Sequence, residues 1–345
     1  MPRALILGVA GKTPGDDERR FFRDADPLGF ILFARNVETP AQVAALVAEL
    51  RAIVGRADAP VLIDQEGGRV ARLVPPHWRA APPAALFGRL ARTNREAARR
   101  AVALNAQLIG AELAALGITV DCAPVLDVPV EGADPIIGDR AFAPDPEPVA
   151  TLGAAFCDGL LAAGVLPVLK HVPGHGRAGI DSHKGLPRVA ASKAELASRD
   201  FAPFRALAGR RAPEPWAMTA HVVFEAYDAD APATLSPTVI VDVVRGEIGF
   251  DGVIISDDLS MGALAGDFGA RARSALAAGC DLALHCNGNM AEMAAIAEAT
   301  GAVGPATADR LARSLGALAA APDFDAGAAL AELDTLISPV AGEAR

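Results

Sequence analysis

The sequence is poor in cysteine and in aromatic residues. Its 345 residues include four cysteines and one tyrosine, and Phe, Trp and Tyr together make up 5% of the chain. No two cysteines form a Cys-x-x-Cys pair, and four are too few for a disulfide framework in a chain of this length. Hydrophobic residues still account for 52% of the sequence. This composition excludes a disordered or fibrous protein and predicts a large core of Ala, Leu, Val and Ile.

Long apolar runs and an excess of positive charge are also missing. No stretch approaches the ~20 apolar residues that cross a membrane. The N-terminal apolar run at 4–9 is short and continues into GKTPGDDERR, which is unlike a signal-peptide cleavage site. The formal net charge is −10, with 32 basic and 42 acidic residues, which disfavours binding to phosphate backbones and anionic lipids. We expect a cytoplasmic protein that binds neither nucleic acid nor membranes.

Short aliphatic runs bounded by turn residues predict eight β-strands. The runs are apolar throughout rather than alternating, as parallel strands covered on both faces should be. The predicted strands lie at 4–9, 29–34, 60–66, 119–128, 165–171, 217–224, 252–258 and 280–286. Helical patterns between most of them lie at 39–55, 95–117, 147–163, 193–209, 237–248, 270–278 and 290–300.

This alternation predicts an α/β fold built from right-handed β-α-β units. A closed (β/α)8 barrel and a doubly wound open sheet both fit the pattern, and the count of eight strands favours the barrel. No linker or change in composition divides the chain. We therefore predict one TIM-like domain over residues 1–345, with the barrel in about 1–304 and one or two additional C-terminal helices in about 305–337.

Six of the predicted strands carry charged or titratable residues at their carboxyl ends. In a (β/α)8 barrel these ends meet on one rim, where active sites form. One polar strand end is usually a surface residue, but six on one rim indicate a functional site. The residues concerned are Asp64, Glu66, Asp127, Lys170, His171, His221, Asp257, Asp258 and His285.

Two predicted loops add candidate residues. The loop after 165–171 runs for about twenty residues before the next helix, whereas most ordered barrel loops are shorter. It contains His175, Asp181 and His183. The loop 133–148 carries Arg140. Long ordered loops are often binding loops or lids, so we expect both to border the pocket.

The residue types suggest proton transfer and attack by a carboxylate. Asp257 follows an apolar strand, where its carboxylate suits a nucleophile, an electrostatic stabiliser or a metal ligand; Asp258 fits the N-cap of a following helix. Asp181 and His183 share a face in an extended segment, so the carboxylate can orient the imidazole and raise its basicity. Lys170 and Arg140 are candidate donors to a polyhydroxyl or anionic ligand.

Two other kinds of site compete with this interpretation. His171, His175, His183 and Asp257 are the ligand types of a barrel metallohydrolase. Their spacing matches no compact zinc motif, and the first predicted strand lacks a His-x-His pair. We therefore predict a site without a metal or other cofactor, with the metallohydrolase as one rival and a non-catalytic sugar-binding protein as the other.

Six motifs, in order and with matching spacing, resemble the β-N-acetylhexosaminidases of glycoside hydrolase family 3, most of all the single-domain bacterial enzymes of peptidoglycan recycling. They are IDQEGGRVAR (63–72), GDRAF (138–142), KHVPGHG (170–176), DSH (181–183), MTAHV (218–222) and SDDLSMGA (256–263). The resemblance extends from about residue 5 to residue 300. The chain departs from the family pattern at Val172, where Phe is more common, and at Ala71, where Gln is common; neither position carries catalytic chemistry.

The resemblance implies a retaining, metal-independent exo-β-N-acetylglucosaminidase that works through a covalent glycosyl-enzyme. Asp257 would be the nucleophile, His183 the general acid/base and Asp181 the partner of His183, whereas most retaining glycosidases use two carboxylates. The residues implied to bind the terminal N-acetylglucosamine are Asp64, Arg72, Arg140, Lys170 and His171. The implied substrate is N-acetylglucosamine β-1,4-linked to 1,6-anhydro-N-acetylmuramic acid, with or without peptide, and many single-domain relatives are monomers.

Three further expectations follow from this assignment. The dyad loop should be mobile, so that His183 lies far from Asp257 in some unliganded states. Arg72, Arg140 and Lys170 should give an acidic protein a locally basic pocket mouth. A histidine acid/base does not repel phosphate as a carboxylate does, so hydrolysis and phosphorolysis of the glycosyl-enzyme both stay open.

Overall fold

Eight parallel strands close into a barrel in the order β1-β10-β9-β7-β5-β4-β3-β2. The computed structural model describes residues 1–210, 212–319 and 323–342. The barrel strands are β1 (Arg3–Gly8), β2 (Pro27–Leu32), β3 (Val61–Ile63), β4 (Val120–Asp121), β5 (Leu166–Val172), β7 (Trp216–Thr219), β9 (Ile254–Asp258) and β10 (Leu282–His285). The predicted TIM-like barrel is confirmed, and the open sheet is excluded because β1 pairs with both β2 and β10.

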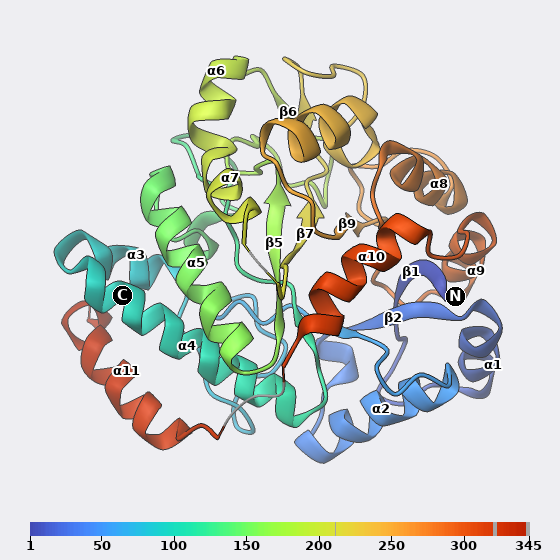
Figure 1. Cartoon of the computed structure of the whole chain (residues 1–345), viewed down its shortest axis with the longest axis horizontal. Helices are drawn as coiled ribbons and strands as arrows, with labels where there is room; N and C mark the ends of the chain where they lie inside the picture. Colours follow the sequence, from blue (N-terminus) through green and yellow to red (C-terminus); the bar gives the residue numbers. More distant parts are fainter. Residues whose placement is uncertain (211, 320–322, 343–345) are drawn as a thin grey trace.

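Helices surround the barrel (Figure 1). Those that the structure describes are α1 (Asp16–Ala25), α2 (Pro40–Ile53), α3 (Ala84–Thr93), α4 (Arg95–Ala115), α5 (Pro146–Ala162), α6 (Lys193–Glu195), α7 (Ala202–Ala208), α8 (Phe268–Ala278), α9 (Met290–Ala299), α10 (Pro305–Ser314) and α11 (Ala326–Ala341). The 3-10 and π helices are η1 (Ala34–Asn36), η2 (Gly138–Arg140), η3 (Leu196–Asp200), η4 (Ala233–Leu235), η5 (Thr238–Glu247) and η6 (Leu315–Ala317). No helix in the described ranges is both long and apolar enough to cross a membrane.

Local sequence signals account for several helix ends. The Thr39 side chain accepts a hydrogen bond from the Gln42 amide at 3.2 Å, and Pro40 occupies the first turn of α2. Asn94 caps α4 in the same way. Helix α1 was not predicted, because its ten residues are mostly charged and only its inner edge, including Phe22, is buried.

Two of the predicted strands differ from the structure. The run 119–128 forms only the two-residue strand β4, because the chain leaves the regular ladder at Pro124, which has no amide hydrogen to donate. The run 217–224 splits into β7 and β8 (Val223–Phe224). Strand β8 leaves the barrel and pairs with β6 (Arg188–Val189) in a separate two-stranded sheet, at the end of the loop that contains His183.

The strands separate two apolar layers, because successive side chains point to opposite faces. Inside the barrel lies a cluster that includes Ile6, Leu62 and Ile255, and outside it Leu5 and Leu7 pack against the helices. Helix α10 closes the end of the barrel at which the strands begin. There the Trp216 indole donates to Ser314 Oγ at 2.9 Å.

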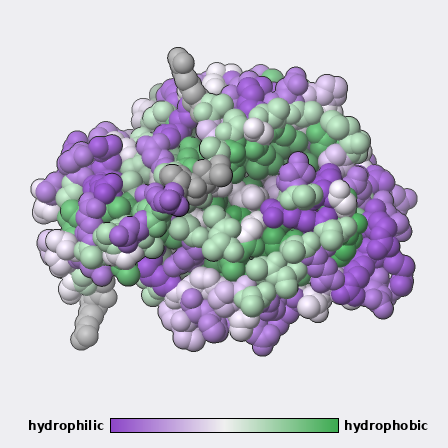
Figure 2. Space-filling model, turned by 60° about the horizontal axis from the view of Figure 1, so that its bottom comes forward, coloured by the Kyte–Doolittle hydropathy of each residue, from purple (hydrophilic) through white to green (hydrophobic). Residues whose placement is uncertain are grey.

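The two C-terminal helices occupy different places. Helix α10 lies across the barrel end, whereas α11 runs along α4 on the outside (Figure 1). Viewed from below, apolar residues gather across the middle of the surface with hydrophilic residues around them (Figure 2). The opposite end of the barrel, where the strands finish, contains the polar residues singled out from the sequence.

Candidate active site

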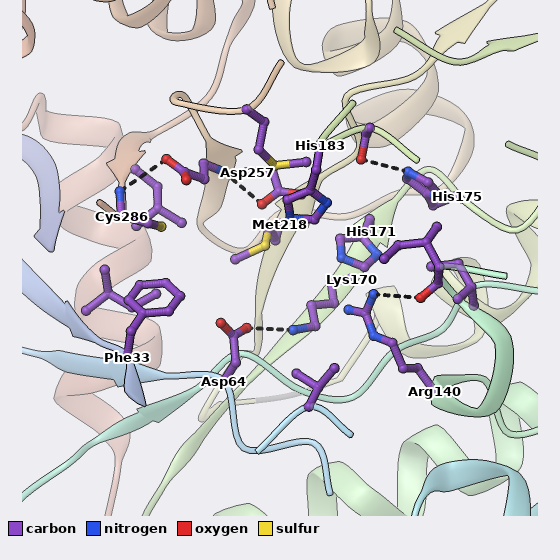
Figure 3. Close-up of a pocket in the computed structure, with 18 of the residues that line it drawn as sticks. Phe33, Asp64, Arg140, Lys170, His171, His175, His183, Met218, Asp257 and Cys286 are labelled. Atoms are coloured by element: carbon purple, nitrogen blue, oxygen red, sulfur yellow. Dashed lines mark hydrogen bonds and ion pairs between the residues drawn. The ribbon is translucent and has the colours of Figure 1, made fainter. Parts of the chain in front are cut away.

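A cavity of ≈ 230 Å³ opens at the carboxyl ends of the strands. Seven of the eight predicted site residues line it, namely Asp64, Arg72, Arg140, Lys170, His171, His183 and Asp257. The eighth, Asp181, is hydrogen-bonded to His183. The predicted convergence of distant motifs on one rim is therefore found. The apolar part of the wall includes Phe33 and Met218 (Figure 3).

Lys170 lies at the centre of a buried network of charges. Its side chain is 2% exposed, and its ammonium contacts Asp64 Oδ1 at 2.8 Å and Glu66 Oε1 at 2.6 Å. Arg140 forms a bidentate ion pair with Glu66 at 2.8 and 2.9 Å. Arg72 binds the second oxygen of Asp64 at 3.0 Å. Figure 3 shows the Asp64 carboxylate facing the Lys170 ammonium.

The network fixes the charge of its members. Burial alone would raise the pKa of Asp64, but the charges of Lys170 and Arg72 outweigh it and hold that pKa well below its ordinary value. For Glu66 the charges of Lys170 and Arg140 likewise outweigh burial and lower the pKa. Burial lowers the pKa of Lys170, yet the two carboxylates raise it above its ordinary value overall. All these groups stay ionised at neutral pH.

The three cations expected at the pocket mouth all line the cavity, but none of them is unpaired. They share two carboxylates, Asp64 and Glu66, because an unpaired charge would be costly away from water. The network therefore keeps an excess of one positive charge. Glu66, which supplies part of this compensation, was noted as a polar strand end but was not among the predicted site residues. The signal was its place between Asp64 and Arg72 in one motif.

Asp127 organises the start of the loop after β5. It accepts from His171 Nδ1 at 2.7 Å and from the main-chain amides of His171 and His175 at 3.2 and 2.6 Å. Burial would raise the pKa of Asp127, but these contacts hold it at about 2. Because Nδ1 of His171 is bound to Asp127, its Nε2 is the ring nitrogen available to a ligand.

His183 and Asp181 form a dyad at the edge of the cavity. Asp181 Oδ1 accepts from the His183 amide at 2.9 Å and contacts its Nδ1 at 2.8 Å. Partial burial would raise the pKa of Asp181, but the hydrogen bonds from His183 outweigh it and lower that pKa. The second ring nitrogen of His183, Nε2, is left for proton transfer. The His183 side chain is 63% exposed.

The dyad loop packs against the neighbouring segments of the rim in this structure. His175 Nε2 and Ser182 Oγ are 3.1 Å apart, and the Ser182 carbonyl accepts from the Ala263 amide at 3.1 Å. His183 and Asp257 therefore line the same cavity (Figure 3). The open arrangement expected for some unliganded states stays a prediction.

Asp257 is the next-to-last residue of β9, and its carboxylate lies at the cavity. Its Oδ1 accepts from the Asp258 amide at 2.8 Å. Burial would raise the pKa of Asp257, but the surrounding imidazoles, the hydrogen bond from the Asp258 amide and the Lys170 charge together outweigh burial and lower it. Asp257 is thus an ionised carboxylate, as a nucleophile must be. The interpretation of Asp258 as a helix N-cap is wrong, because α8 begins ten residues later with Asp267 as its cap.

The described residues offer no ligand cluster to the rival metal site. Within residues 1–210, 212–319 and 323–342, no three His, Cys, Asp or Glu side chains are grouped so that they could hold a metal ion. The neighbouring His171 and His175 have ring centroids 5.7 Å apart. One is bound to Asp127 and the other to Ser182.

Comparison with known proteins agrees with this arrangement. The sequence profile of the glycosyl hydrolase family 3 N-terminal domain matches residues 7–314. The chain belongs to glycosyl hydrolase family 3. It is a glycoside hydrolase of the β-hexosaminidase group in that family, so the predicted family and enzyme class are confirmed.

Two relatives named beta-hexosaminidase are similar over most of their length. The one from Methylococcus capsulatus is 42% identical over 284 residues, 82% of this chain and 82% of that protein. The one from Pseudomonas aeruginosa is 40% identical over 289 residues, 83% of each chain. NagZ from Neisseria gonorrhoeae, crystallised with N-trifluoroacetyl-D-glucosamine, matches with a TM-score of 0.87 and 31% identity over 98% of this chain and 99% of that chain.

The charge network of this family 3 chain makes a testable prediction. Replacing Glu66 by Gln leaves the buried Arg140 guanidinium without its carboxylate, so we expect the free energy of unfolding at pH 7 to fall by about 3–5 kcal/mol. The surface variant Glu96→Gln, which loses only a pair with Arg99, should change it by less than about 1 kcal/mol. Urea unfolding measures both.

The pH dependence of the same variant has a definite sign. The pKa of Glu66 is lower in the folded than in the unfolded chain, so its stabilisation is complete above its ordinary pKa of 4.5 and is lost as the pH falls through the lower folded value. The difference in free energy of unfolding between wild type and Glu66→Gln should therefore become smaller below about pH 4.5. A difference that stays constant down to pH 3 would contradict the account.

Proposed function

We propose that this protein is a retaining exo-β-N-acetylglucosaminidase that removes terminal N-acetylglucosamine from peptidoglycan fragments in the cytoplasm. We further propose that it acts as a monomer with one catalytic domain over residues 1–345 and needs no cofactor. The observation that supports the reaction best is one cavity lined by both an ionised carboxylate, Asp257, and a carboxylate-oriented imidazole, His183.

The first chemical step forms a glycosyl-enzyme. An oxygen of Asp257 bonds to the anomeric carbon as the bond to the leaving oxygen breaks. His183, protonated on both nitrogens, gives its Nε2 proton to that oxygen. Asp181 holds Nδ1–H at 2.8 Å and stabilises the imidazolium before the transfer.

The second step releases the sugar. Water gives a proton to the now neutral Nε2 of His183 and bonds to the anomeric carbon, while the bond to Asp257 breaks and restores the carboxylate. Both substitutions invert the anomeric centre, so the β configuration is retained overall. Phosphate in the place of water would give a glycosyl phosphate instead.

The charge network suits a polyhydroxyl ligand. We propose that Asp64, Arg72, Arg140, Lys170 and His171 bind the terminal N-acetylglucosamine. Paired carboxylates and cations present both acceptors and donors in fixed positions, which matches hydroxyl groups that donate and accept. The bound N-trifluoroacetyl-D-glucosamine of the Neisseria gonorrhoeae structure supports a ligand of this kind.

The substrate that we propose is N-acetylglucosamine β-1,4-linked to 1,6-anhydro-N-acetylmuramic acid, with or without peptide. A cavity of ≈ 230 Å³ bordered by the dyad loop has room for one terminal sugar rather than a continuous chain, which agrees with exo action. The aglycone then lies outside, next to the exposed side of His183.

A hydrolysis assay with 4-nitrophenyl β-N-acetylglucosaminide tests the function. Wild type should release nitrophenol, and Asp257→Ala should lose at least roughly 10³-fold in kcat, because the covalent step has no nucleophile. Lys184→Ala, which alters an exposed neighbour of the dyad, serves as the control. An inactive wild type, or an Asp257→Ala variant that keeps its activity, would refute the proposal; replacing a non-nucleophilic buffer by phosphate distinguishes hydrolysis from phosphorolysis.

Leaving-group dependence tests the role of His183. His183→Ala should lose roughly 10²- to 10⁴-fold in kcat/KM on a disaccharide but much less on a 2,4-dinitrophenyl glycoside, whose leaving group needs no proton. The measurement is kcat/KM for a series of aryl glycosides against leaving-group pKa, with a steeper slope for the variant. Equal losses on all substrates would remove the acid role.

A further inference from the structure

The main chain around Asp257 is bound by three buried side chains that the proposed mechanism does not use. Thr219 is the last residue of β7, His221 lies two residues further along the chain, and Thr234 lies in η4. All three are 0% exposed. Buried hydroxyl and imidazole groups are costly unless their hydrogen bonds are satisfied, so their partners indicate what they do.

The contacts run from one residue to the next. Asp257 N lies 3.3 Å from Thr219 Oγ1, and Thr219 Oγ1 lies 2.8 Å from Thr234 Oγ1. Thr234 Oγ1 lies 2.7 Å from His221 Nδ1. His221 Nε2 lies 3.0 Å from the carbonyl oxygen of Asp258. The series therefore begins at the amide of the proposed nucleophile and ends at the carbonyl of the next residue.

The chemistry of the two ends determines the direction of each hydrogen bond. The Asp258 carbonyl only accepts, so His221 donates from Nε2. Burial is the largest influence on the pKa of His221 and lowers it despite the nearby Asp257, so the ring is neutral and Nδ1 is an acceptor. Thr234 must then donate to Nδ1, although the Ala220 carbonyl at 3.1 Å is a competing acceptor.

The remaining bonds follow from this assignment. Because the single hydroxyl proton of Thr234 goes to His221, Thr219 must donate its own proton to Thr234 Oγ1. The Thr219 oxygen is then free to accept the Asp257 amide hydrogen. Every donor has one acceptor, and the hydrogen bonds point in one direction around the Asp257–Asp258 segment.

We propose that Thr219, Thr234 and His221 form a one-directional hydrogen-bond circuit that positions Asp257 for attack on the anomeric carbon. The circuit holds the amide of Asp257 and the carbonyl of Asp258, and the Asp258 amide in turn holds Asp257 Oδ1 at 2.8 Å. Because Oδ1 of Asp257 is held by this amide, the other carboxylate oxygen, Oδ2, is the one that attacks the anomeric carbon. The three residues are positioning residues, and the inference rests on the proposed role of Asp257 as nucleophile.

The circuit is tested by isosteric variants. Thr219→Val keeps the shape and removes the hydroxyl, so kcat on the 4-nitrophenyl glycoside should fall roughly 10- to 100-fold through misplacement of the carboxylate. KM should change less than about threefold, because the proposed sugar-binding residues belong to other elements. Thr219→Ser restores the hydroxyl and should recover most of the lost kcat, and Thr335→Val on the exposed face of α11 controls for Thr-to-Val exchange.

Coupling between the two threonines gives a second readout. Thr234→Val breaks the same circuit, so the double variant should lose no more kcat than the more impaired single variant. If the fold losses in kcat of the two single variants multiply in the double variant, the two threonines do not act in a single circuit. Folding of each variant is checked by thermal unfolding. All rates are measured roughly 15 °C below the lowest midpoint, because a loss of 1 kcal/mol shifts the midpoint of a large domain by only about 2–4 °C.

The histidine tautomer gives a test that needs no activity. Nitrogen-15 spectra of the six histidines, with His221→Gln for assignment, should show His221 as the neutral Nε2–H tautomer at pH 7. The Nδ1–H tautomer, or a folded Thr219→Val variant with wild-type kcat, would overturn the circuit. If wild type itself does not hydrolyse the glycoside, the proposed function fails; if wild type is active and Thr219→Val is its equal, only the circuit fails.

Discussion

The pairing of Lys170 with Asp64 and Glu66 is the constraint on which the site depends. Closure of the barrel leaves this ammonium 2% exposed, and a charge removed from water to that extent is tolerated only with opposite charges in contact. Arg72 also binds Asp64 and Arg140 also binds Glu66, so that three cations share the two carboxylates. Three segments, namely residues 64–72, β5 and η2, are therefore bound to one another at the rim by this network, which also leaves donors and acceptors facing the cavity.

The proposed catalytic groups are supported in two different ways. Asp257 belongs to a barrel strand, and its backbone is bound to β7 and η4 through fully buried side chains. His183 belongs to a long loop and is held by Asp181, its neighbour two residues away, with Ser182 as the contact to the rest of the site. A rigid nucleophile and a more independent acid/base suit a reaction in which the sugar must enter and leave past the loop.

Local patterns were sufficient for the barrel and for the convergence of polar strand ends on one rim, but not for the contacts among those side chains. Continuous apolar runs predicted eight strands, and all eight exist, although β4 is short because Pro124 interrupts the ladder. Strand ends predicted which residues meet, since parallel strands finish on one rim. The neutralisation of Arg140 by Glu66 was not predictable, because it depends on which side chains face each other across 74 residues. Neither was the departure of β8 from the barrel, because a strand's pairing partner is not encoded in its own pattern.

The central claim is that Asp257 becomes covalently bonded to the sugar. Incubation with the 5-fluoro derivative of N-acetylglucosaminyl fluoride slows release of the glycosyl-enzyme, so that the adduct can be located by peptide mapping and mass spectrometry. We predict one sugar per chain, on the peptide that contains Asp257, and no adduct in Asp257→Ala. An adduct on another residue, or turnover of the reagent by wild type with inversion of the anomeric centre, would contradict the account.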